Sequence, residues 1–419
     1  MSAYHLSKSM EKAESPACET LHQCKKLVIP SAKRQWVLWQ ADFAMHCLRN
    51  EKESLTNVYA PLALSAVLAM LLLGGDKQTK AKIEKTMGAP KGFSKRIIES
   101  FMPILQELRN NPQVQLTADL FASDGHRAQK EYVELLLELF GSKMNDIAKT
   151  GQIFPSRRYS LSSSHARLLA EASTVITAPW DSGVVRPTSP RPFMVSHALK
   201  IPEHPYFTIS GKFRCLQTRV YEAWMLPLDS APGCNTKLAL ILIRPVFVGL
   251  LLDMFRRMHG HSLLGLIKRI HKQKEQNSCL LVPKMQVPLG GQGDLPTDLL
   301  VKNGEFYGDG KYPEMFPYQA KLDHFFHAGA ISLSKSGVGF FNDEEQTPTK
   351  PRTSPECFSA RFDSPFVFLV VECLSEAPLT IGSYSGPNGV SPSYLSRPFK
   401  RPGLCQRRKS RSSNTCAVM

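Results

Sequence analysis

Two basic side chains lie in a long polar segment where a protease could reach them. Lys350 and Arg352 fall within residues 338–359, a run in which prolines at 348 and 351 oppose regular strand pairing. A trypsin-like serine protease has an acidic specificity pocket, which accepts lysine and arginine side chains from a substrate. The same two residues would also serve as ordinary solvent-exposed charges. The sequence alone leaves both interpretations open, a protease substrate and a charged surface loop.

Strand-like sequence borders this segment on both sides. The stretch before it is His327-Ala-Gly-Ala-Ile-Ser-Leu-Ser-Lys-Ser-Gly337, and the stretch after it is Phe362-Asp-Ser-Pro-Phe-Val-Phe-Leu-Val-Val-Glu372. A structureless segment of this length inside a compact domain is usually functional or disordered. Because both ends are anchored, we expect residues 338–359 to be displayed on the surface.

A set of further motifs follows the order found in a known family. They are Asp42-Phe-Ala-Met-His-Cys-Leu48, Asn57-Val-Tyr-Ala-Pro61 with the apolar run after it, Thr79-Lys-Ala-Lys-Ile-Glu-Lys-Thr-Met87, Gly211-Lys-Phe-Arg214, Met225-Leu-Pro-Leu228 and Leu281-Val-Pro-Lys-Met-Gln-Val287. Together with the loop and its flanks, they resemble the serpin family over residues 36–387. The resemblance implies an α+β fold with a large mixed central sheet, two smaller sheets, surrounding helices and an exposed reactive loop.

The resemblance also divides the chain into parts. We expect a polar N-terminal tail over residues 1–35, a serpin domain over 36–394, and a basic, disordered C-terminal tail over 395–419. The family places a sheet-covering helix before residue 153, and the segment there is too short to contain it. Either this chain has lost the helix or the gene model is in error.

The family's activity makes a specific demand on the hinge at the start of the loop. Serpins inhibit serine proteases without being enzymes: the protease cuts the reactive loop, which then inserts into the central sheet as a new strand. Insertion requires small residues in the hinge. The corresponding residues here are Gly337, Val338, Gly339, Phe340 and Phe341, and the two phenylalanines are large.

The residues after the hinge also oppose insertion. Asn342, Asp343 and Glu344 would carry polar or charged groups onto a strand with one buried face. Each buried, unpaired polar group costs about 1–3 kcal/mol, and a charge costs more. The prolines at 348 and 351 would remove ladder hydrogen bonds as well. We therefore expect loop insertion to be slow or absent, and inhibition to be reduced or lost.

Two further regions of the family manage the opening of the sheet. The shutter uses two serines, an asparagine and a histidine, and the matching positions here are Ala60, Ala63, Ala172 and His327. Only the histidine is kept. At the second region, the breach, the family's tryptophan is present as Trp180.

Counting within the resemblance brackets the bond that a protease would cut. The count forward from Gly337 places the cut after Pro351, and the count back from Phe362 places it after Ser354. Lys350 lies beside this window, but the proline that follows it discourages cleavage. The predicted scissile bond is Arg352–Thr353, for a trypsin-like protease.

Two basic regions account for much of the net charge of +16. The last 25 residues contain seven lysines and arginines and no acidic residue, and residues 256–274 form a second run on an expected amphipathic helix with Leu263, Leu264, Leu266 and Ile267 on its buried side. Such regions attract heparin-like chains, nucleic acid or acidic membranes. The alternative is a solvated helix face. We expect a polyanion or an acidic membrane as partner, and no specific nucleic acid.

The chain ends in a motif that could carry a lipid. Cys416-Ala-Val-Met419 is a C-a-a-X pattern, for which methionine in the last position indicates farnesylation. One lipid chain binds membranes only marginally, and the basic stretch before it would supply the usual second signal. The alternative is an unmodified, disordered tail.

Other features limit the location and the cofactors. Residues 1–35 lack the apolar core of a signal peptide, so we expect a cytoplasmic protein, membrane-associated through its tail, with the extracellular location of many serpins as the alternative. The ten cysteines show no Cys-x-x-Cys spacing, and His324 and His327 have no second ligand pair. We expect free thiols, no metal, no cofactor and a monomer.

Three functions are consistent with the sequence. The first is a serpin-type serine protease inhibitor whose hinge and shutter reduce or abolish inhibition. The second is a non-inhibitory protein of the same fold that acts as a protease substrate or binding protein. The third is a basic scaffold held at membranes by a prenylated C-terminus.

Overall fold

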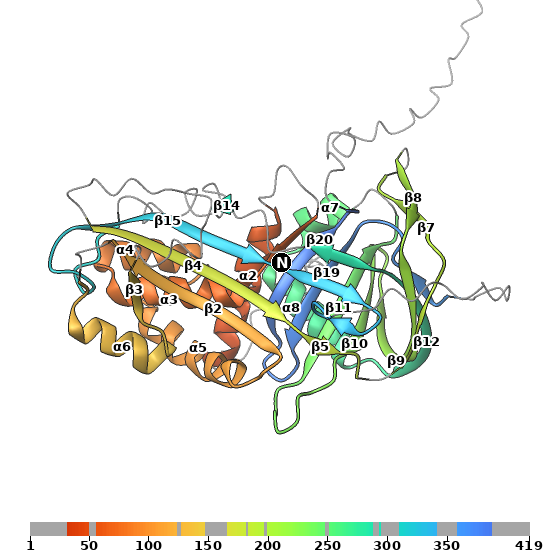
Figure 1. Cartoon of the computed structure of the whole chain (residues 1–419), viewed down its shortest axis with the longest axis horizontal. Helices are drawn as coiled ribbons and strands as arrows, with labels where there is room; N and C mark the ends of the chain where they lie inside the picture. The colour runs from red at the N-terminus through yellow and green to blue at the C-terminus, as the bar shows by residue number, and fades with distance from the viewer. Residues whose placement is uncertain are drawn as a thin grey trace, which may run out of the picture.

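The computed structural model describes residues 32–49, 56–123, 127–146, 166–181, 183–196, 199–247, 251–287, 293–294, 310–341 and 358–387 (Figure 1). Residues 147–165, the bond Arg352–Thr353 and Cys416 lie outside these ranges. The missing helix, the scissile bond and the lipid attachment predicted there therefore stay predictions.

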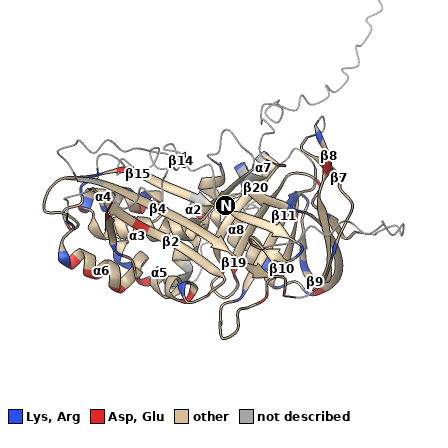
Figure 2. Ribbon diagram, viewed as in Figure 1, with Lys and Arg blue, Asp and Glu red and all other residues tan. Residues whose placement is uncertain are grey.

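Five described helices come from the first third of the chain. They are α2 (Ala32–Arg49), α3 (Pro61–Gly74), α4 (Lys77–Thr86), α5 (Ser94–Arg109) and α6 (Lys130–Phe140). In Figure 1, α3 to α6 lie at one end of the molecule, behind one face of a sheet, and α2 lies near its middle. On the outer helices, basic and acidic residues are interspersed rather than segregated (Figure 2). The first described helix, α2, begins at Ala32, within the range assigned to the N-terminal tail.

Helix α3 is the central buried element. Pro61 occupies its first turn, where a missing backbone N–H costs nothing, and every residue except Leu73 is buried. It packs against strands of two different sheets, β4 and β20. A helix that is apolar all round can be stable only inside a protein core or a membrane. None of the helices that the structure describes is long and apolar enough to span a bilayer.

A buried carboxylate ties α4 to α5. Glu84 is 1% exposed, and its oxygens accept hydrogen bonds from the Gly92 backbone N–H at 2.7 Å and from the Ser94 backbone N–H at 2.8 Å. The Ser94 hydroxyl donates to the same carboxylate. These bonds hold the turn that leads into α5.

Replacing Glu84 by alanine should leave these buried donors without an acceptor. We expect the variant's free energy of unfolding to fall by about 3 kcal/mol, because hydrogen bonds to charged groups contribute about 1.5–3 kcal/mol each and partly cooperate. Urea denaturation followed by circular dichroism measures this. The exposed Glu99 on α5 is the matched control, and its alanine variant should change stability by less than about 0.5 kcal/mol.

The largest sheet in the described residues has nine strands. In spatial order it runs β1 (Asn57–Tyr59), β20 (Ala377–Tyr384), β19 (Phe366–Glu372), β11 (Leu238–Pro245), β10 (Tyr221–Pro227), β9 (Tyr206–Gln217), β12 (Glu275–Pro283) and β18 (Ala360–Arg361), with β6 (Val184–Pro187) on β9. Every residue of β19 and β20 is buried. Strand β19 is a nearly continuous apolar run, as expected where both faces of a sheet are covered, whereas β20 also buries Thr380 and Ser383.

The central sheet consists of two hydrogen-bonded pieces. The five-stranded piece runs β14 (Gly293–Asp294), β15 (Ala320–Gly329), β4 (Ala166–Ile176), β2 (Val114–Ala122) and β3 (Met144–Asp146). The four-stranded piece runs β13 (Met285–Val287), β16 (Ile331–Ser334), β17 (Gly337–Val338) and β5 (Ala178–Pro179). One residue separates β15 from β16, and one separates β4 from β5, so the two pieces continue each other.

The sheet is mixed, because β15 and β4 are parallel whereas β2 and β4 are antiparallel. This confirms the predicted α+β class with a mixed central sheet. A separate two-stranded sheet is formed by β7 (Arg191–Met194) and β8 (Lys200–His204).

The basic run 256–274 was predicted to lie on one helix. The structure divides it between α7 (Leu251–Arg257) and α8 (Gly260–His271). The division has a local cause: Gly260 packs against Asp42 of α2, whose Oδ1 accepts a hydrogen bond from the Gly260 N–H. The buried side of α8 is the predicted one, with Leu263, Leu264, Leu266 and Ile267 in the core.

Candidate functional site

The hinge residues Gly337 and Val338 are already part of the sheet. They form β17, which pairs antiparallel with β16 on one side and with β5 on the other. Val338 stands opposite Leu333 and Ala178, and Gly337 stands opposite Ser334 and Pro179. Val338 had been expected to begin the displayed loop. Instead, the first two hinge residues start a new strand between β5 and β16.

Two glycines make this close approach possible. Gly337 has φ +151°, and a Cβ on it would stand 2.3 Å from the Ala178 carbonyl oxygen. Gly339 has φ +136°, and a Cβ there would stand 2.7 Å from the Thr177 Cα. The Gly339 N–H donates to the Ser332 carbonyl oxygen at 2.8 Å, which extends the pairing by one bond. Only glycine fits both positions without strain.

The side chain of Val338 sets the orientation of the inserted strand. It is fully buried, whereas the Phe340 side chain is 39% exposed at the point where the described hinge ends. Phe341 follows it and is half-buried. The hinge therefore enters the sheet with Val338 and leaves it before Phe340.

We call the central sheet open where β17 lies between β16 and β5. Next to the hinge the sheet is closed, because no strand lies between β15 and β4. Strands β15 and β4 pair directly along their length, from Ala320 opposite Ala166 to Gly329 opposite Thr174. A loop that inserted further would have to separate these strands. The hinge thus stops where the open part of the sheet meets the closed part.

Trp180, the predicted breach residue, lies beside the strand next to the hinge. Its Nε1 donates to the Ser334 carbonyl oxygen at 3.1 Å, and its backbone forms a bridge to Leu228. Its ring lies 6.2 Å from the ring of Phe207, measured between centroids. Because Ser334 also pairs with Gly337, Trp180 contacts the strand beside which the hinge is inserted.

The structure brings three of the four shutter positions together. His327 stands opposite Ala172 in the β15–β4 register, and its Nε2 accepts a hydrogen bond from the Ala60 N–H at 3.0 Å. The Tyr59 ring stacks on the imidazole at 5.6 Å. Ala63 is buried in the first turn of α3. With alanine at these positions, the shutter histidine bonds to backbone rather than to the family's serine and asparagine side chains.

Burial of His327 predicts a pH dependence of stability. Desolvation lowers the pKa of His327 from 6.5 to about 4, so the unfolded chain binds the extra proton first as pH falls. The stabilising contribution is therefore complete above pH 6.5 and is lost toward pH 4. Between pH 7 and 4.5 we expect a loss of about 2–3 kcal/mol from this residue.

The measurement is the free energy of unfolding at both pH values for the chain and its His327→Gln variant. Burial also lowers the pKa of His204 to about 4, so part of the acid loss persists in the variant. The difference between the two proteins should shrink toward low pH. A difference that does not change with pH would contradict the neutral, buried imidazole.

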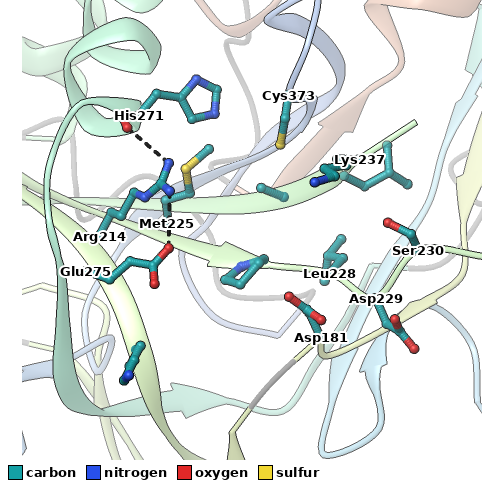
Figure 3. A pocket seen from close by; sticks show the side chains of 14 residues that line it. Asp181, Arg214, Met225, Leu228, Asp229, Ser230, Lys237, His271, Glu275 and Cys373 are labelled. Atoms are coloured by element: carbon teal, nitrogen blue, oxygen red, sulfur yellow. Dashed lines mark hydrogen bonds and ion pairs between the residues drawn. The ribbon is translucent and has the colours of Figure 1, made fainter. Parts of the chain in front are cut away.

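A cavity of about 620 Å³ adjoins the breach (Figure 3). Its wall is bonded to β5, because the Asp229 N–H donates to the Pro179 carbonyl oxygen at 2.9 Å. On the far side Arg214 donates to the His271 carbonyl oxygen at 3.0 Å and pairs with Glu275 at 3.1 Å. Met225 and other apolar side chains line the floor between these polar groups.

Sequence reasoning did not identify this cavity. Its lining comes from β9, β10, β11, the end of α8, the start of β12 and the residue after β19. These segments are far apart in the chain, and no motif spacing joins them. The basic residues Lys212 and Lys237 and the acidic Asp181 are exposed, so the cavity is an open, charged cleft.

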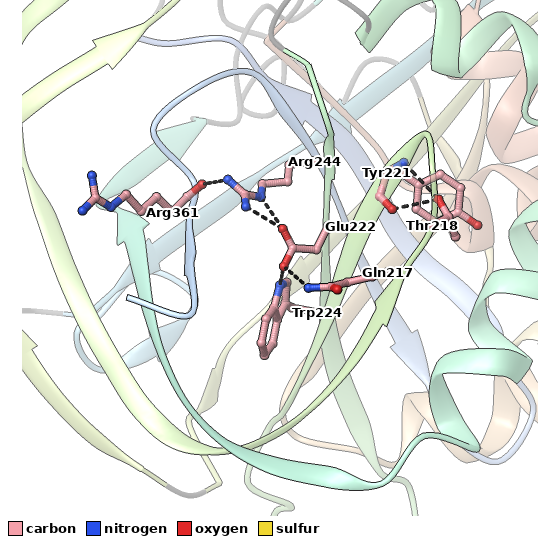
Figure 4. A network of polar contacts seen from close by, with 7 residues as sticks. All are labelled: Gln217, Thr218, Tyr221, Glu222, Trp224, Arg244 and Arg361. Atoms are coloured by element: carbon pink, nitrogen blue, oxygen red, sulfur yellow. Dashed lines mark hydrogen bonds and ion pairs between the residues drawn. The ribbon is translucent and has the colours of Figure 1, made fainter. Parts of the chain in front are cut away.

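A second unpredicted feature holds the segment after the loop (Figure 4). Arg244 donates to the Arg361 carbonyl oxygen at 2.9 Å and pairs with Glu222 at 2.6 Å. The Trp224 indole N–H donates to the same carboxylate at 2.8 Å. Phe358 packs between two guanidinium groups, with the Cζ of Arg361 at 5.1 Å from its ring centroid. Both ends of the loop are thus bound to sheet strands.

Comparisons with known proteins agree with this architecture. The family model described as serpin (serine protease inhibitor) matches residues 39–152. No curated protein matches the chain in sequence.

Solved structures with the same fold cover most of the chain. Human thyroxine-binding globulin complexed with thyroxine superimposes with a TM-score of 0.67 at 14% identity, covering 85% of this chain and 100% of its own. Native protease nexin-1 with heparin gives 0.64 at 15%, covering 85% and 100%. Human glycosylated kallistatin gives 0.65 at 16%, covering 85% and 99%. At these identities the likeness shows the fold.

The structure places Gly337 and Val338 in the sheet, Trp180 beside them and His327 on β15. Their roles as hinge, breach and shutter stay predictions. The serpin family model matches residues 39–152 and the serpin fold is shared over most of the chain, so this protein has the serpin fold and resembles that family in sequence near its N-terminal side.

Proposed function

We propose that this protein presents its loop to a trypsin-like serine protease and is cut there without completing loop insertion. It would then act as a protease substrate or a weak inhibitor. The observation that carries the proposal is the buried Val338, because it fixes which later side chains would enter the interior.

Side chains alternate between the two faces of a strand. If the strand begun by β17 were extended, the residues at even positions would follow Val338 inward, namely Phe340, Asn342 and Glu344. A buried glutamate without a partner is among the most costly groups that a core can receive. The charge of Glu344 and the bulk of Phe340 therefore oppose the step on which covalent trapping depends.

The closed part of the sheet adds a second barrier. Further insertion must break the β15–β4 pairing next to the hinge, beginning with Gly329 and Thr174. The hydrogen bond from the Ala60 N–H to His327 lies at the His327–Ala172 pair, which is the pair next to Ala328–Ser173. A loop whose own residues cost free energy on burial cannot offset the loss of these bonds.

Incubation with trypsin followed by denaturing electrophoresis tests the proposal. We expect cleavage within residues 342–357 and no band at the combined mass of the chain and the protease. Arg352→Ala should remove the cut, whereas Lys350→Ala is the matched control and should leave it unchanged. A covalent complex that survives denaturation would contradict the proposal.

The cavity beside the breach favours a second candidate function. A similar structure is a thyroxine-binding globulin complexed with thyroxine, and this chain carries an open cleft of about 620 Å³ next to its hinge. A non-inhibitory binding protein would use such a cleft for a small ligand. The electrophoresis experiment separates the two functions: a chain that trypsin-like proteases leave uncut in residues 342–357 would favour the binding protein.

A further inference from the structure

Three large apolar side chains stand together on the surface, where two strand ends meet. Val220 is 42% exposed in the turn between β9 and β10, and Val246 and Phe247 are 48% and 64% exposed after β11. The Val246 N–H donates to the Val220 carbonyl oxygen at 2.9 Å, so the two turns are adjacent. We call Val220, Val246 and Phe247 the apolar tip. Scattered single apolar residues are normal on protein surfaces, but a contiguous group indicates an interaction site.

Two arginines lie beside the apolar tip, and two more follow it in the chain. Arg219 is exposed and directly precedes Val220. Arg269 of α8 is exposed and donates to the Tyr221 hydroxyl at 2.9 Å, which places it beside the same turn. Helix α7 begins four residues after Phe247 and ends with the exposed Arg256 and Arg257. We call Arg219, Arg256, Arg257 and Arg269 the basic rim.

The acidic groups of this region do not cancel the basic rim. Asp253 pairs with Arg256 at 3.5 Å. Glu222 is buried and paired with Arg244 at 2.6 Å, so it takes no part in the surface. Arg219 and Arg257 remain exposed with no ion pair to a described residue.

The combination of an apolar tip and a basic rim selects the kind of partner. A sulfated polysaccharide would be attracted by the arginines but offers nothing to the exposed Phe247. A membrane surface with anionic lipids satisfies both, because apolar side chains enter the boundary between headgroups and acyl chains while arginines contact the lipid phosphates. The tip residues lie at turns, which suits insertion into a bilayer. We propose that the apolar tip and the basic rim dock this protein on an anionic membrane surface.

This contact does not require the C-terminal lipid motif. Its residues belong to the folded domain: they lie in the β9–β10 turn, directly after β11, and on α7 and α8. Binding should therefore persist in a chain whose Cys416 is unmodified.

Sedimentation with lipid vesicles tests the proposal on the full-length chain produced in bacteria, where no prenyl group is added. We expect binding to phosphatidylcholine vesicles that contain phosphatidylserine, and little binding to phosphatidylcholine alone. Phe247→Ser should weaken binding about tenfold, by removing the apolar side chain that would enter the bilayer. Arg219→Gln should weaken it about fivefold, since each basic residue near an anionic surface contributes about 1 kcal/mol.

Leu137→Ser is the matched control, because Leu137 is 51% exposed on the distant helix α6. It should bind like the unaltered chain. All variants change exposed side chains, and unaltered melting temperatures would show that they remain folded.

A second set of chains separates the domain from the tail. In the full-length chain with the seven basic residues of the last 25 replaced by glutamine, phosphatidylserine-dependent binding should persist and should still respond to Phe247→Ser. Two results would overturn the proposal. One is binding that Arg219→Gln weakens but Phe247→Ser does not, which would mean a general polyanion site. The other is loss of all vesicle binding when the tail is neutralised.

Discussion

Replacing Val338 by arginine is expected to expel β17 from between β5 and β16. Val338 is fully buried, and a guanidinium at this position would enter the core without a partner. The sheet would lose the valine's burial and the backbone bonds on both sides of the hinge. We expect the free energy of unfolding to fall by about 3–5 kcal/mol, from a buried valine and two or more ladder hydrogen bonds. Chemical denaturation measures it.

Hydrogen exchange gives an independent test of the same change. The Gly339 N–H, which bonds to Ser332, should lose its protection in the arginine variant. Val184→Arg is the matched control, because Val184 is a strand valine that is 55% exposed. It should leave both stability and exchange unchanged. Protection of Gly339 that survived Val338→Arg would mean that the hinge is not held by this pocket.

Replacing the inward-facing loop residues by alanine is expected to restore insertion after cleavage. The variant carries Phe340→Ala, Asn342→Ala, Glu344→Ala, Gln346→Ala and Pro348→Ala, so that the inward face of the new strand becomes small and apolar over residues 338–348. Ten or so ladder hydrogen bonds of about 1 kcal/mol each would then add about 10 kcal/mol to the cleaved form. At about 2 °C per kcal/mol for a domain of this size, the cleaved variant should melt about 20 °C above the intact one.

The control for this experiment changes the other face of the same segment. Phe341→Ala, Asp343→Ala and Glu345→Ala replace the residues that alternation directs away from the core. These substitutions should not produce the rise in melting temperature. An equal rise in both variants would show that the side-chain direction set by Val338 does not continue along the loop.

These effects depend on the division of the central sheet into an open and a closed part. The open part already holds two hinge residues, with Trp180 bonded to Ser334 beside them. The closed part is held by the β15–β4 pairing, to which His327 and Ala60 add one buried bond. The hinge has therefore taken the first step of insertion, and the residues that come next are those least suited to the second.

Elements with a strong local pattern were predictable from the sequence. The continuous apolar run that became α3 and the buried strand β19 needed no information from the rest of the chain. The shutter histidine and the breach tryptophan were predicted from neighbouring motifs, and their roles stay predictions.

Features built from distant segments could not be predicted in the same way. The strand β17 contains only two residues, and its partner Ala178 lies far away in the chain. The pattern of glycine, valine and glycine gave a signal in retrospect, because two glycines flanking one apolar residue suit a backbone that passes close to its neighbours. The bond from Arg244 to the Arg361 carbonyl depends on tertiary contacts alone.

The most direct test of the central claim is the melting temperature of the unaltered chain before and after cleavage within residues 342–357. A loop that is cut but does not insert should leave the melting temperature within about 2 °C, because no new strand is added to the sheet. A rise of about 20 °C after cleavage would mean that the loop inserts in spite of Phe340, Asn342 and Glu344, and would contradict this account.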